Sequence, residues 1–417
     1  MVPFWQELRR GRWLTADRAR TYSLILLGLY GIAIVGWILL SDHWIDRNGK
    51  PVGTDFSSFY AAGSMALQGH AADVYDMAAH FAREQQLFGA ATPYYGWLYP
   101  PIFLLIATPL ALLPYPMALI VWQGASLAFY LGVIAAILRG PRRDNEIIAR
   151  LWLPVAAAFP AVFINLGHGQ NGFLTAALLG AALVTLRPRP MLSGILFGLL
   201  AYKPQFGLLI PFALLAGGQW RTIVAAGITV LALAGLTTLA FGGEIWWLFA
   251  ASTETSRKLL LEQGDVGFEK LQSVFAAIRM WGGGISLAYA VQSIASLIAI
   301  GGVVWSWRSS ADREVKAALL IVATLLGSPH VLDYDLTIFA PAIAFLVAAG
   351  CARHFRDYDI SLMAAAWIVP LIARAVAGST GVPVGLFAIV ALYAVAMRRA
   401  TEARTISGIA SPRVAQA

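Results

Sequence analysis

Long apolar segments recur along almost the whole chain and are separated by short polar turns. Inside hydrocarbon each such segment must satisfy its own backbone hydrogen bonds, which a helix does without a partner strand. The pattern therefore predicts an all-α polytopic membrane protein with a bundle of about 12 transmembrane helices. The predicted spans are 22–40, 117–138, 149–166, 172–186, 190–203, 205–217, 222–241, 285–307, 317–328, 336–350, 360–377 and 383–397.

The longest polar stretch, from residue 41 to about residue 96, separates the first two predicted spans. Within it, segments 57–68 and 74–88 have the mixed aromatic and polar pattern of amphipathic helices that lie on a bilayer surface. The apolar run 99–113 that follows is too short for a comfortable span. We expect this run to form a re-entrant or interfacial helix.

Basic residues are distributed unevenly over the predicted loops. If the run near 100–113 is re-entrant, most arginines fall on one side of the membrane, although the two longest loops lie on the other side. Cytoplasmic loops are enriched in Lys and Arg, so we expect both termini to be cytoplasmic in a bacterial-type inner membrane. The first apolar run follows a basic segment but lacks a small-x-small cleavage site, which favours a retained anchor.

This orientation divides the chain into predicted parts. The transmembrane domain extends from 22 to 397 and carries two large outer loops, 41–116 and 242–284. The N-terminal segment 1–21 and the tail 398–417 are predicted to be cytoplasmic, and the small, polar residues after 400 favour disorder in that tail.

Composition supports the membrane class. Hydrophobic residues make up 59% of the 417-residue chain and charged residues only 12%, whereas soluble domains carry about 25% charged residues. The net charge of +8 is explained by cytoplasmic loops, and no basic patch interleaved with aromatic residues suggests a nucleic-acid partner. The single cysteine, Cys351, rules out an internal disulfide and a cysteine-cluster metal site.

A carboxylate precedes the first amphipathic helix of the outer loop. Asp55, within the sequence Thr54–Tyr60, could act as a general base if it lies within hydrogen-bond reach of an acceptor hydroxyl. Alternatively, Asp55 or Thr54 could simply cap the helix.

Two further motifs lie on the predicted outer side. The aromatic Pro-Pro turn Trp97–Phe103 could open the re-entrant helix or belong to an interfacial aromatic belt. The glycine-rich turn Asn165–Asn171 carries amide and imidazole groups that suit sugar hydroxyls, although it could be a plain polar turn. It contains no lysine, unlike a phosphate-binding glycine-rich loop.

The remaining candidates are charged. Asp333 and Asp335 resemble a metal-binding acidic pair, but two residues cannot complete an octahedral site, so a divalent cation there is only a minor option. Lys203 interrupts an apolar stretch as either a snorkelling side chain or a counter-charge to a phosphate. Arg257 and Lys258 belong to the second outer loop, which could equally be a solvated loop of mixed charge.

Taken as an ordered set, these motifs resemble the polyprenol-phosphate-mannose-dependent mannosyltransferases of glycosyltransferase family eighty-seven, within the GT-C superfamily. The motifs that carry the resemblance are Thr54-Asp55-Phe56, Tyr60-Ala61-Ala62, Tyr99-Pro100-Pro101, Pro109-Leu110-Ala111-Leu112-Leu113-Pro114, Gly169-Gln170-Asn171, Lys203-Pro204-Gln205 and Ser328-Pro329. The sequence departs from the family pattern after Ser328-Pro329, where His330 comes early and Asp333-Tyr334-Asp335 follow.

The resemblance implies transfer of a hexose, mannose above all, from a polyprenyl-monophosphate donor to a lipid or glycan acceptor on the outer face. It further implies inversion at the anomeric carbon, no metal or other cofactor, and Asp55 as the catalytic base. Membrane lipids are the other expected partners. The residues expected to bind substrate or donor are Tyr60, Tyr99, His168, Gln170, Asn171, Lys203, Gln205, Arg257, Lys258, His330, Asp333 and Asp335.

Two other functions remain open from the sequence. A transporter or lipid flippase would be expected to carry inverted repeats and charges at mid-membrane, and neither is evident. A non-catalytic assembly subunit would not need so many polar motifs on one face.

Overall fold

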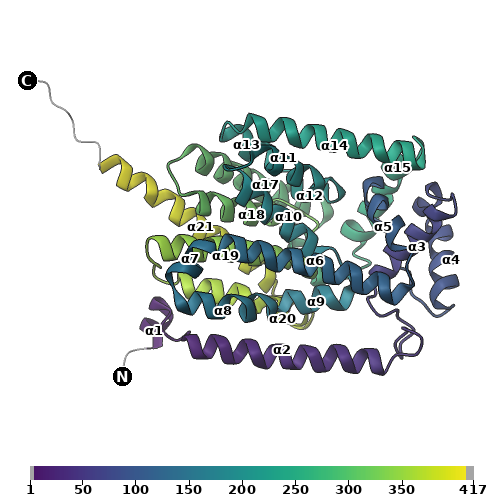
Figure 1. Ribbon diagram of the computed structural model, residues 1–417, viewed down its shortest axis with the longest axis horizontal. Coiled ribbons are helices and arrows are strands. Elements are labelled where there is room, and N and C mark those ends of the chain that lie inside the picture. Colours follow the sequence, from purple (N-terminus) through teal and green to yellow (C-terminus); the bar gives the residue numbers. More distant parts are fainter. Residues whose placement is uncertain (1–3, 410–417) are drawn as a thin grey trace, which may run out of the picture.

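The computed structural model describes residues 4–409, with side chains as far as Thr401, and this part of the chain is helical without a β-strand (Figure 1). A short helix α1 (Phe4–Arg10) precedes the first long one. Within residues 4–409, eight segments are long and apolar enough to cross a membrane. They are α2 (Ala16–Leu39), α6 (Tyr115–Ile137), α8 and α9 together (Glu146–Ala157 and Pro160–His168), α14 (Trp220–Phe241), α17 (Ile285–Arg308), η6 with α19 (Asp333–Ile338 and Phe339–Ala352), α20 (Asp359–Thr380) and α21 (Val384–Ile409).

The other four predicted spans form shorter helices. These are α10 (Gly172–Thr185), α11 with η3 (Pro190–Gly198 and Leu199–Tyr202), α12 with α13 (Pro204–Gly207 and Ile210–Ala216), and α18 (Arg313–Leu326). Each predicted span therefore coincides with a helix, and the all-α polytopic class is confirmed. The number of helices that cross the bilayer stays a prediction.

Helix ends differ from the predictions at both ends of the chain. Helix α2 begins at Ala16, capped by the Thr15 hydroxyl, rather than at 22. Helix α21 continues to Ile409 instead of ending at 397, so the prediction of disorder after residue 400 is wrong as far as 409. The rest of the predicted tail, 410–417, lies outside the described residues.

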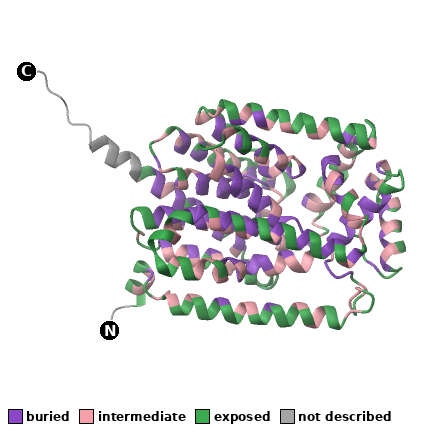
Figure 2. Cartoon of the chain, in the orientation of Figure 1, coloured by how far each residue is buried: buried purple, intermediate pink, exposed green. Residues whose placement is uncertain are grey.

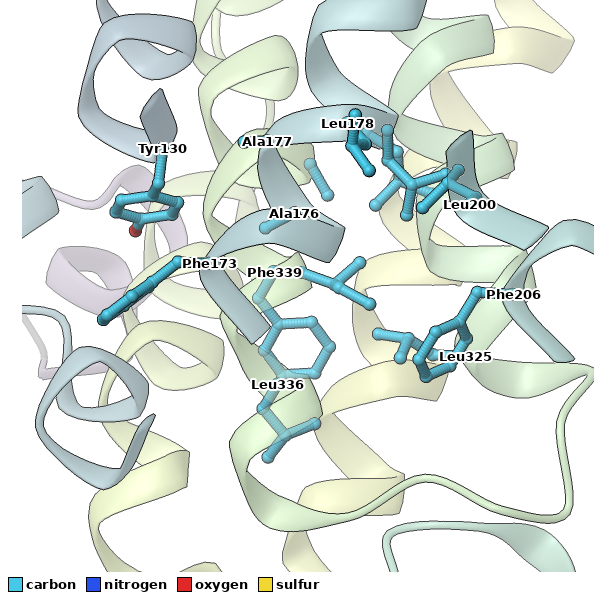
Figure 3. Packing of buried hydrophobic residues seen from close by; sticks show 14 of the residues in the cluster. Tyr130, Phe173, Ala176, Ala177, Leu178, Leu200, Phe206, Leu325, Leu336 and Phe339 are labelled. Atoms are coloured by element: carbon cyan, nitrogen blue, oxygen red, sulfur yellow. The ribbon is translucent and has the colours of Figure 1, made fainter. Parts of the chain in front are cut away.

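Helices α10, α18 and α19 occupy the centre of the bundle. Ala176 of α10 lies beside Phe339 of α19 in Figure 3, and both are fully buried. The buried ring of Phe173, also of α10, points the other way and lies 5.6 Å from the ring of Tyr130 of α6. A side chain at Gly180 would place its Cβ 2.7 Å from Val133 Cγ1 of α6, so this glycine permits close approach of α10 and α6. Small residues thus allow the short central helix to pack tightly.

The outermost helices expose apolar side chains. Figure 2 shows α2 and α14 on opposite sides of the bundle with mostly exposed residues. Ile32 of α2 is 73% exposed, and Leu231 and Leu239 of α14 are 73% and 87% exposed. Continuous exposed apolar faces of this kind fit lipid rather than water.

The first large loop folds into a helical layer at one end of the bundle (Figure 1). It contains α3 (Phe56–Leu67), the 3₁₀ helix η1 (Ala72–Tyr75), α4 (Met77–Phe88), η2 (Pro101–Phe103) and α5 (Leu104–Leu110). The predicted short helix after the Pro-Pro turn is confirmed, with Pro101 at its first position. Its depth in the bilayer stays a prediction.

Two details of this layer correct the sequence prediction. Segment 74–88 is two helices, because Asp76 is extended and its carboxylate caps α4 through Ala78 N and Ala79 N. Helix α3 is buried along most of its length by α4 and α5 instead of lying on the surface, since its apolar and small residues occupy nearly every face. Only α4 has the expected single buried face.

The second large loop contains helices that the sequence pattern did not predict. They are α15 (Ile245–Arg257), a π-helical turn η4 (Lys258–Gln263), η5 (Phe268–Lys270) and α16 (Val274–Met280). Helix α15 contacts η1 of the first loop, where the rings of Tyr75 and Phe249 are 5.8 Å apart. The two loops therefore pack against each other at the same end of the bundle.

Membrane orientation can be tested by cysteine labelling in a Cys351→Ser background. Asn48 and Asp265 belong to the two large loops, and Asp144 lies at the opposite end of the bundle; all three are exposed. We expect a membrane-impermeant maleimide to label cysteines at 48 and 265 in intact cells, and one at 144 only after permeabilisation. Labelling of position 144 in intact cells would reverse the proposed orientation.

Candidate active site

Asp55 lies at the start of α3, where its carboxylate faces the turn between α9 and α10. Gln170 Nε2 donates a hydrogen bond of 2.9 Å to Asp55 Oδ2, and His168 Nδ1 lies 3.8 Å from Asp55 Oδ1. The side chain of Asp55 is 25% exposed and that of His168 is 31% exposed. The Asp55 carboxylate is thus oriented by hydrogen bonding and remains partly exposed at the surface of the protein.

Helix capping does not account for Asp55. Although Asp55 occupies the position before α3, its side chain makes no capping hydrogen bond. Thr54 does not cap the helix either, because its hydroxyl is 2.9 Å from His168 Nδ1. The alternative that one of these two residues caps α3 is therefore wrong.

Gln170 is held rigidly by its neighbours. Its Oε1 accepts hydrogen bonds from Tyr99 OH at 3.0 Å and from the Asn171 backbone N at 3.1 Å, which leaves Nε2 to point at Asp55. Its backbone oxygen accepts from Gln123 Nε2 at 3.2 Å and from Asn165 Nδ2 at 2.9 Å. A plain polar turn does not require this network. The network fixes Gln170 Nε2 as a hydrogen-bond donor to Asp55 Oδ2.

Two glycines make the turn possible. Gly169 has a left-handed backbone with φ of +63°, and a Cβ there would lie 2.5 Å from Phe56 Cβ. A Cβ at Gly172 would lie 2.5 Å from Asn165 Oδ1, which accepts the Gly172 N–H. The glycines therefore serve close packing against α3 and the network rather than a phosphate cradle.

Tyr99 and Asn171 supply buried polar groups beside this turn. Burial and the charge of Asp55 raise the pKa of Tyr99 well above its usual value, so its hydroxyl stays a donor. The Asn171 side chain is fully buried beside the Tyr99 hydroxyl, which interacts with it, but neither its nitrogen nor its oxygen makes a hydrogen bond of good geometry. Buried amides with unused hydrogen-bonding capacity are rare, which sets Asn171 apart from the other residues of the turn.

Lys203 and Asp335 form a buried ion pair. Lys203 Nζ lies 2.6 Å from Asp335 Oδ1, and the two side chains are only 5% and 1% exposed. Asp335 Oδ2 also accepts the Leu332 backbone N–H at 3.0 Å. Lys203 is neither snorkelling nor an unpaired cation, because the chain itself supplies its counter-charge.

His330 and Asp333 lie near this pair. Burial lowers the pKa of His330, which favours the neutral imidazole next to Lys203. Asp333 Oδ1 accepts the Tyr334 N–H at 2.8 Å, and its carboxylate is within electrostatic range of both His168 and Asp55. His330 thus lies beside the Lys203–Asp335 pair, and Asp333 lies on the side of His168 and Asp55.

Other predicted residues have different surroundings. Tyr60 OH donates to Leu113 O at 2.9 Å and so joins α3 to the turn between α5 and α6. Arg257 pairs with Glu262, and Lys258 pairs with Glu254 at 2.7 Å. Among the described residues, no hydrogen bond or ion pair joins Arg257, Lys258 or Gln205 to Lys203 or Asp55.

The described part of the chain contains no group of three or more His, Cys, Asp or Glu side chains that could hold a metal ion. Asp335 is already engaged by Lys203 and Leu332 N. Metal-independent chemistry nevertheless stays a prediction.

Sequence inspection missed several residues that shape the site. Gln123 and Trp122 of α6 hold the glycine-rich turn, with Trp122 Nε1 donating to Gly169 O at 3.0 Å. The Tyr334 ring lies 5.2 Å from Lys203 Nζ and 6.0 Å from the His168 ring, so it is close to both side chains. An isolated Gln, Trp or Tyr in an apolar span gives no signal of its own.

A buried acid supports the segment that leads to Tyr99. Glu84 Oε2 accepts the Tyr95 N–H at 3.0 Å, while Oε1 has no partner and the whole side chain is buried. Burial raises the pKa of Glu84 to about 8, so the acid is mostly neutral at neutral pH. His80, one turn earlier on α4, is also buried, and burial lowers its pKa to about 4.

Glu84→Gln is expected to flatten the pH dependence of stability. Between about pH 4.3, where an unfolded Glu titrates, and pH 8 the folded state holds a proton that the unfolded state has lost. The free energy of unfolding therefore falls as the pH rises through this range. Gln imitates the protonated acid and still accepts the Tyr95 N–H.

Thermal unfolding of the purified protein in detergent from pH 5 to pH 9 measures this difference. We expect the wild-type melting temperature to fall over this range more steeply than that of Glu84→Gln. The exposed, ion-paired Glu146 offers a matched control, and Glu146→Gln should follow the wild type. Parallel curves for wild type and Glu84→Gln would show that Glu84 is charged in the folded protein.

The arrangement combines a partly exposed, oriented carboxylate with a neighbouring imidazole, a buried amide with unused hydrogen-bonding capacity and a buried lysine. Such a set can accept a proton from a hydroxyl group and bind a polar, uncharged ligand.

Comparison with known proteins agrees with this chemistry. The model of glycosyltransferase family 87 matches residues 97–329, which include Tyr99, Gln170 and Lys203 but not Asp55. Two curated relatives are both named polyprenol-phosphate-mannose-dependent alpha-(1-2)-phosphatidylinositol pentamannoside mannosyltransferase. The protein from Mycobacterium tuberculosis (strain CDC 1551 / Oshkosh) is 23% identical over 61% of this chain and 59% of its own length. The protein from Mycolicibacterium smegmatis (strain ATCC 700084 / mc(2)155) is 25% identical over 66% of this chain and 65% of its own length.

The matched region thus spans about three fifths of the length of these relatives. No solved structure matches the chain significantly.

Proposed function

Because the chain belongs to glycosyltransferase family 87, we propose that it transfers a hexose, most suitably mannose, from a polyprenyl-monophosphate donor to a lipid or glycan acceptor. The observation that carries the mechanism is the Asp55 carboxylate, held by Gln170 Nε2 at 2.9 Å and partly open to the outside. The polyprenol-phosphate-mannose named for the two relatives supports the choice of donor.

In the proposed reaction, Asp55 takes the proton of the acceptor hydroxyl as its oxygen forms a bond to the anomeric carbon. The bond between that carbon and the phosphate oxygen breaks, and the polyprenyl phosphate leaves with the bonding electrons. A single displacement of this kind inverts the anomeric configuration. Under the predicted orientation, transfer takes place on the outer face, as in a GT-C enzyme.

Two features support binding of an uncharged sugar beside Asp55. The Asn171 amide, which makes no hydrogen bond of good geometry within the protein, can donate to one hydroxyl and accept from another. His168, 3.8 Å from Asp55, is near enough to contact the same ligand. The relatives' names support a mannosylated glycolipid as the acceptor class.

The decisive experiment is an in vitro transfer assay. Purified protein is incubated with radiolabelled polyprenyl-phosphate mannose and a membrane lipid extract, and labelled products are separated from donor. We expect a new labelled glycolipid that forms without added metal and persists in the presence of a chelator. Movement of the donor between leaflets of proteoliposomes with no labelled product would instead support a flippase.

A further inference from the structure

A cavity of about 370 Å³ opens at the end of the bundle opposite Asp55. Its lining residues come from the end of α6, the short helix α7 (Arg139–Asp144) and the start of α8. Figure 1 shows α7 and α8 at the end of the bundle away from α3. Gly132, Ala135, Ala136 and Ala149 line it with little side-chain volume, and three arginines, Arg139, Arg142 and Arg143, complete the lining. The cavity thus combines a basic rim with a smooth apolar wall.

None of the three arginines takes part in an ion pair within the described residues, although Asp144 follows Arg143 directly in the chain. Their neighbour Arg150 differs, since it pairs with Glu146. Three guanidinium groups within five residues repel one another, and an anion in the cavity would relieve that repulsion.

Arg142 is fixed in position before any ligand arrives. Its guanidinium carbon lies 4.4 Å from the centroid of the Trp152 ring of α8, a cation–π arrangement. One nitrogen, Nη1, contacts Ala135 O at 3.5 Å, whereas the buried Nε has no partner. The end of α6 therefore satisfies only part of this guanidinium, and Nε is left for an acceptor oxygen.

Guanidinium groups match phosphate because their planar forks can donate two parallel hydrogen bonds to it. A free phosphate would use the basic rim alone, whereas a phospholipid would also cover the alanine and glycine wall with its glycerol and acyl portion. Basic pockets between helices at the membrane surface bind anionic lipid headgroups for the same reason.

We propose that this cavity is a binding site for the phosphate headgroup of an anionic phospholipid. The lipid sits with its phosphate between Arg139, Arg142 and Arg143 and its apolar part along the end of α6. Under the predicted orientation this lipid belongs to the inner leaflet, far from the transfer reaction. The site is independent of the proposed glycosyl transfer.

Native mass spectrometry of the delipidated full chain, titrated with phosphatidylglycerol, tests the site. Wild-type protein should retain phosphatidylglycerol in preference to the zwitterionic phosphatidylcholine. Loss of one charge-assisted phosphate contact should weaken phosphatidylglycerol binding about tenfold in Arg142→Gln. Arg143→Gln, which removes an exposed guanidinium without disturbing the Trp152 contact, should weaken it as well and covers the case that Arg142→Gln folds poorly.

The matched control is Arg150→Gln, which removes an arginine of the same membrane end that lies outside the cavity lining. It should bind phosphatidylglycerol like the wild type. Equal weakening in Arg150→Gln, or equal retention of phosphatidylcholine and phosphatidylglycerol, would show surface charge or hydrophobic adhesion and overturn the proposal. Full displacement of the lipid by inorganic phosphate at similar concentration would assign the cavity to a soluble anion instead.

Discussion

Asp55→Asn is expected to lower the turnover number for glycosyl transfer by about 10²–10⁴-fold, the usual contribution of a general base. The substitution removes the proton acceptor but keeps an oxygen that can accept the hydrogen bond from Gln170 Nε2. Because Asp55 makes no capping bond, α3 should not lose stability. Expression, melting temperature and donor binding should therefore match the wild type while turnover falls.

Asp73 and Asp76 provide matched controls in the same loop. Asp73 pairs with His70, and Asp76 caps α4, so each already has a structural partner. Asp73→Asn and Asp76→Asn should retain most of the activity, since Asn also serves as a helix cap. The assignment of Asp55 is wrong if either control abolishes turnover while Asp55→Asn remains active.

Much of the fold could be predicted because hydrophobic segments must be helical in lipid. The hydrophobic pattern could not predict which faces of the helices are buried against one another. Helix α3 looks amphipathic from its Tyr and Ser residues, yet Ser57 is buried and its Oγ donates to Thr54 O. A serine that satisfies its hydroxyl on the backbone just before it can be buried at low cost, so its polarity misleads a pattern-based prediction.

The candidate site shows a similar limit. Gly169-Gln170-Asn171 stands out in the sequence because its glycines and amides interrupt apolar runs. The partner of Gln170, however, is 115 positions away in the chain, and the partner of Lys203 is 132 positions away. Sequence inspection identified these residues one by one and did not predict that Lys203 pairs with Asp335. In this pair, each side chain neutralises the charge of the other.

The second large effect concerns this pair. From the sequence alone, Lys203→Met should weaken donor use and leave the fold intact. The structure changes this expectation, because the substitution would leave the Asp335 carboxylate buried without its cation. Breaking a buried pair by removing one partner costs about 3–5 kcal/mol. We therefore expect Lys203→Met to lower the melting temperature and the yield of folded protein markedly.

A double variant separates stability from catalysis. In Lys203→Met/Asp335→Asn the buried charge disappears from both sides, and the oxygen of the introduced amide can still accept the Leu332 N–H. Replacing both members of a buried pair is often nearly neutral, so most of the lost stability should return, within about 1 kcal/mol of the wild type. Thermal unfolding of the wild type, both single variants and the double variant gives the coupling energy of the pair.

Donor saturation of the folded double variant then decides whether Lys203 also acts on the substrate. If the positive charge of Lys203 stabilises the bound donor phosphate, this variant should show a raised KM for polyprenyl-phosphate mannose. An unchanged KM would limit Lys203 to holding η6 against η3, where Asp335 and Lys203 are anchored. A Lys203→Met single variant as stable as the wild type would contradict the ion pair itself, because an uncompensated carboxylate cannot remain buried there without cost.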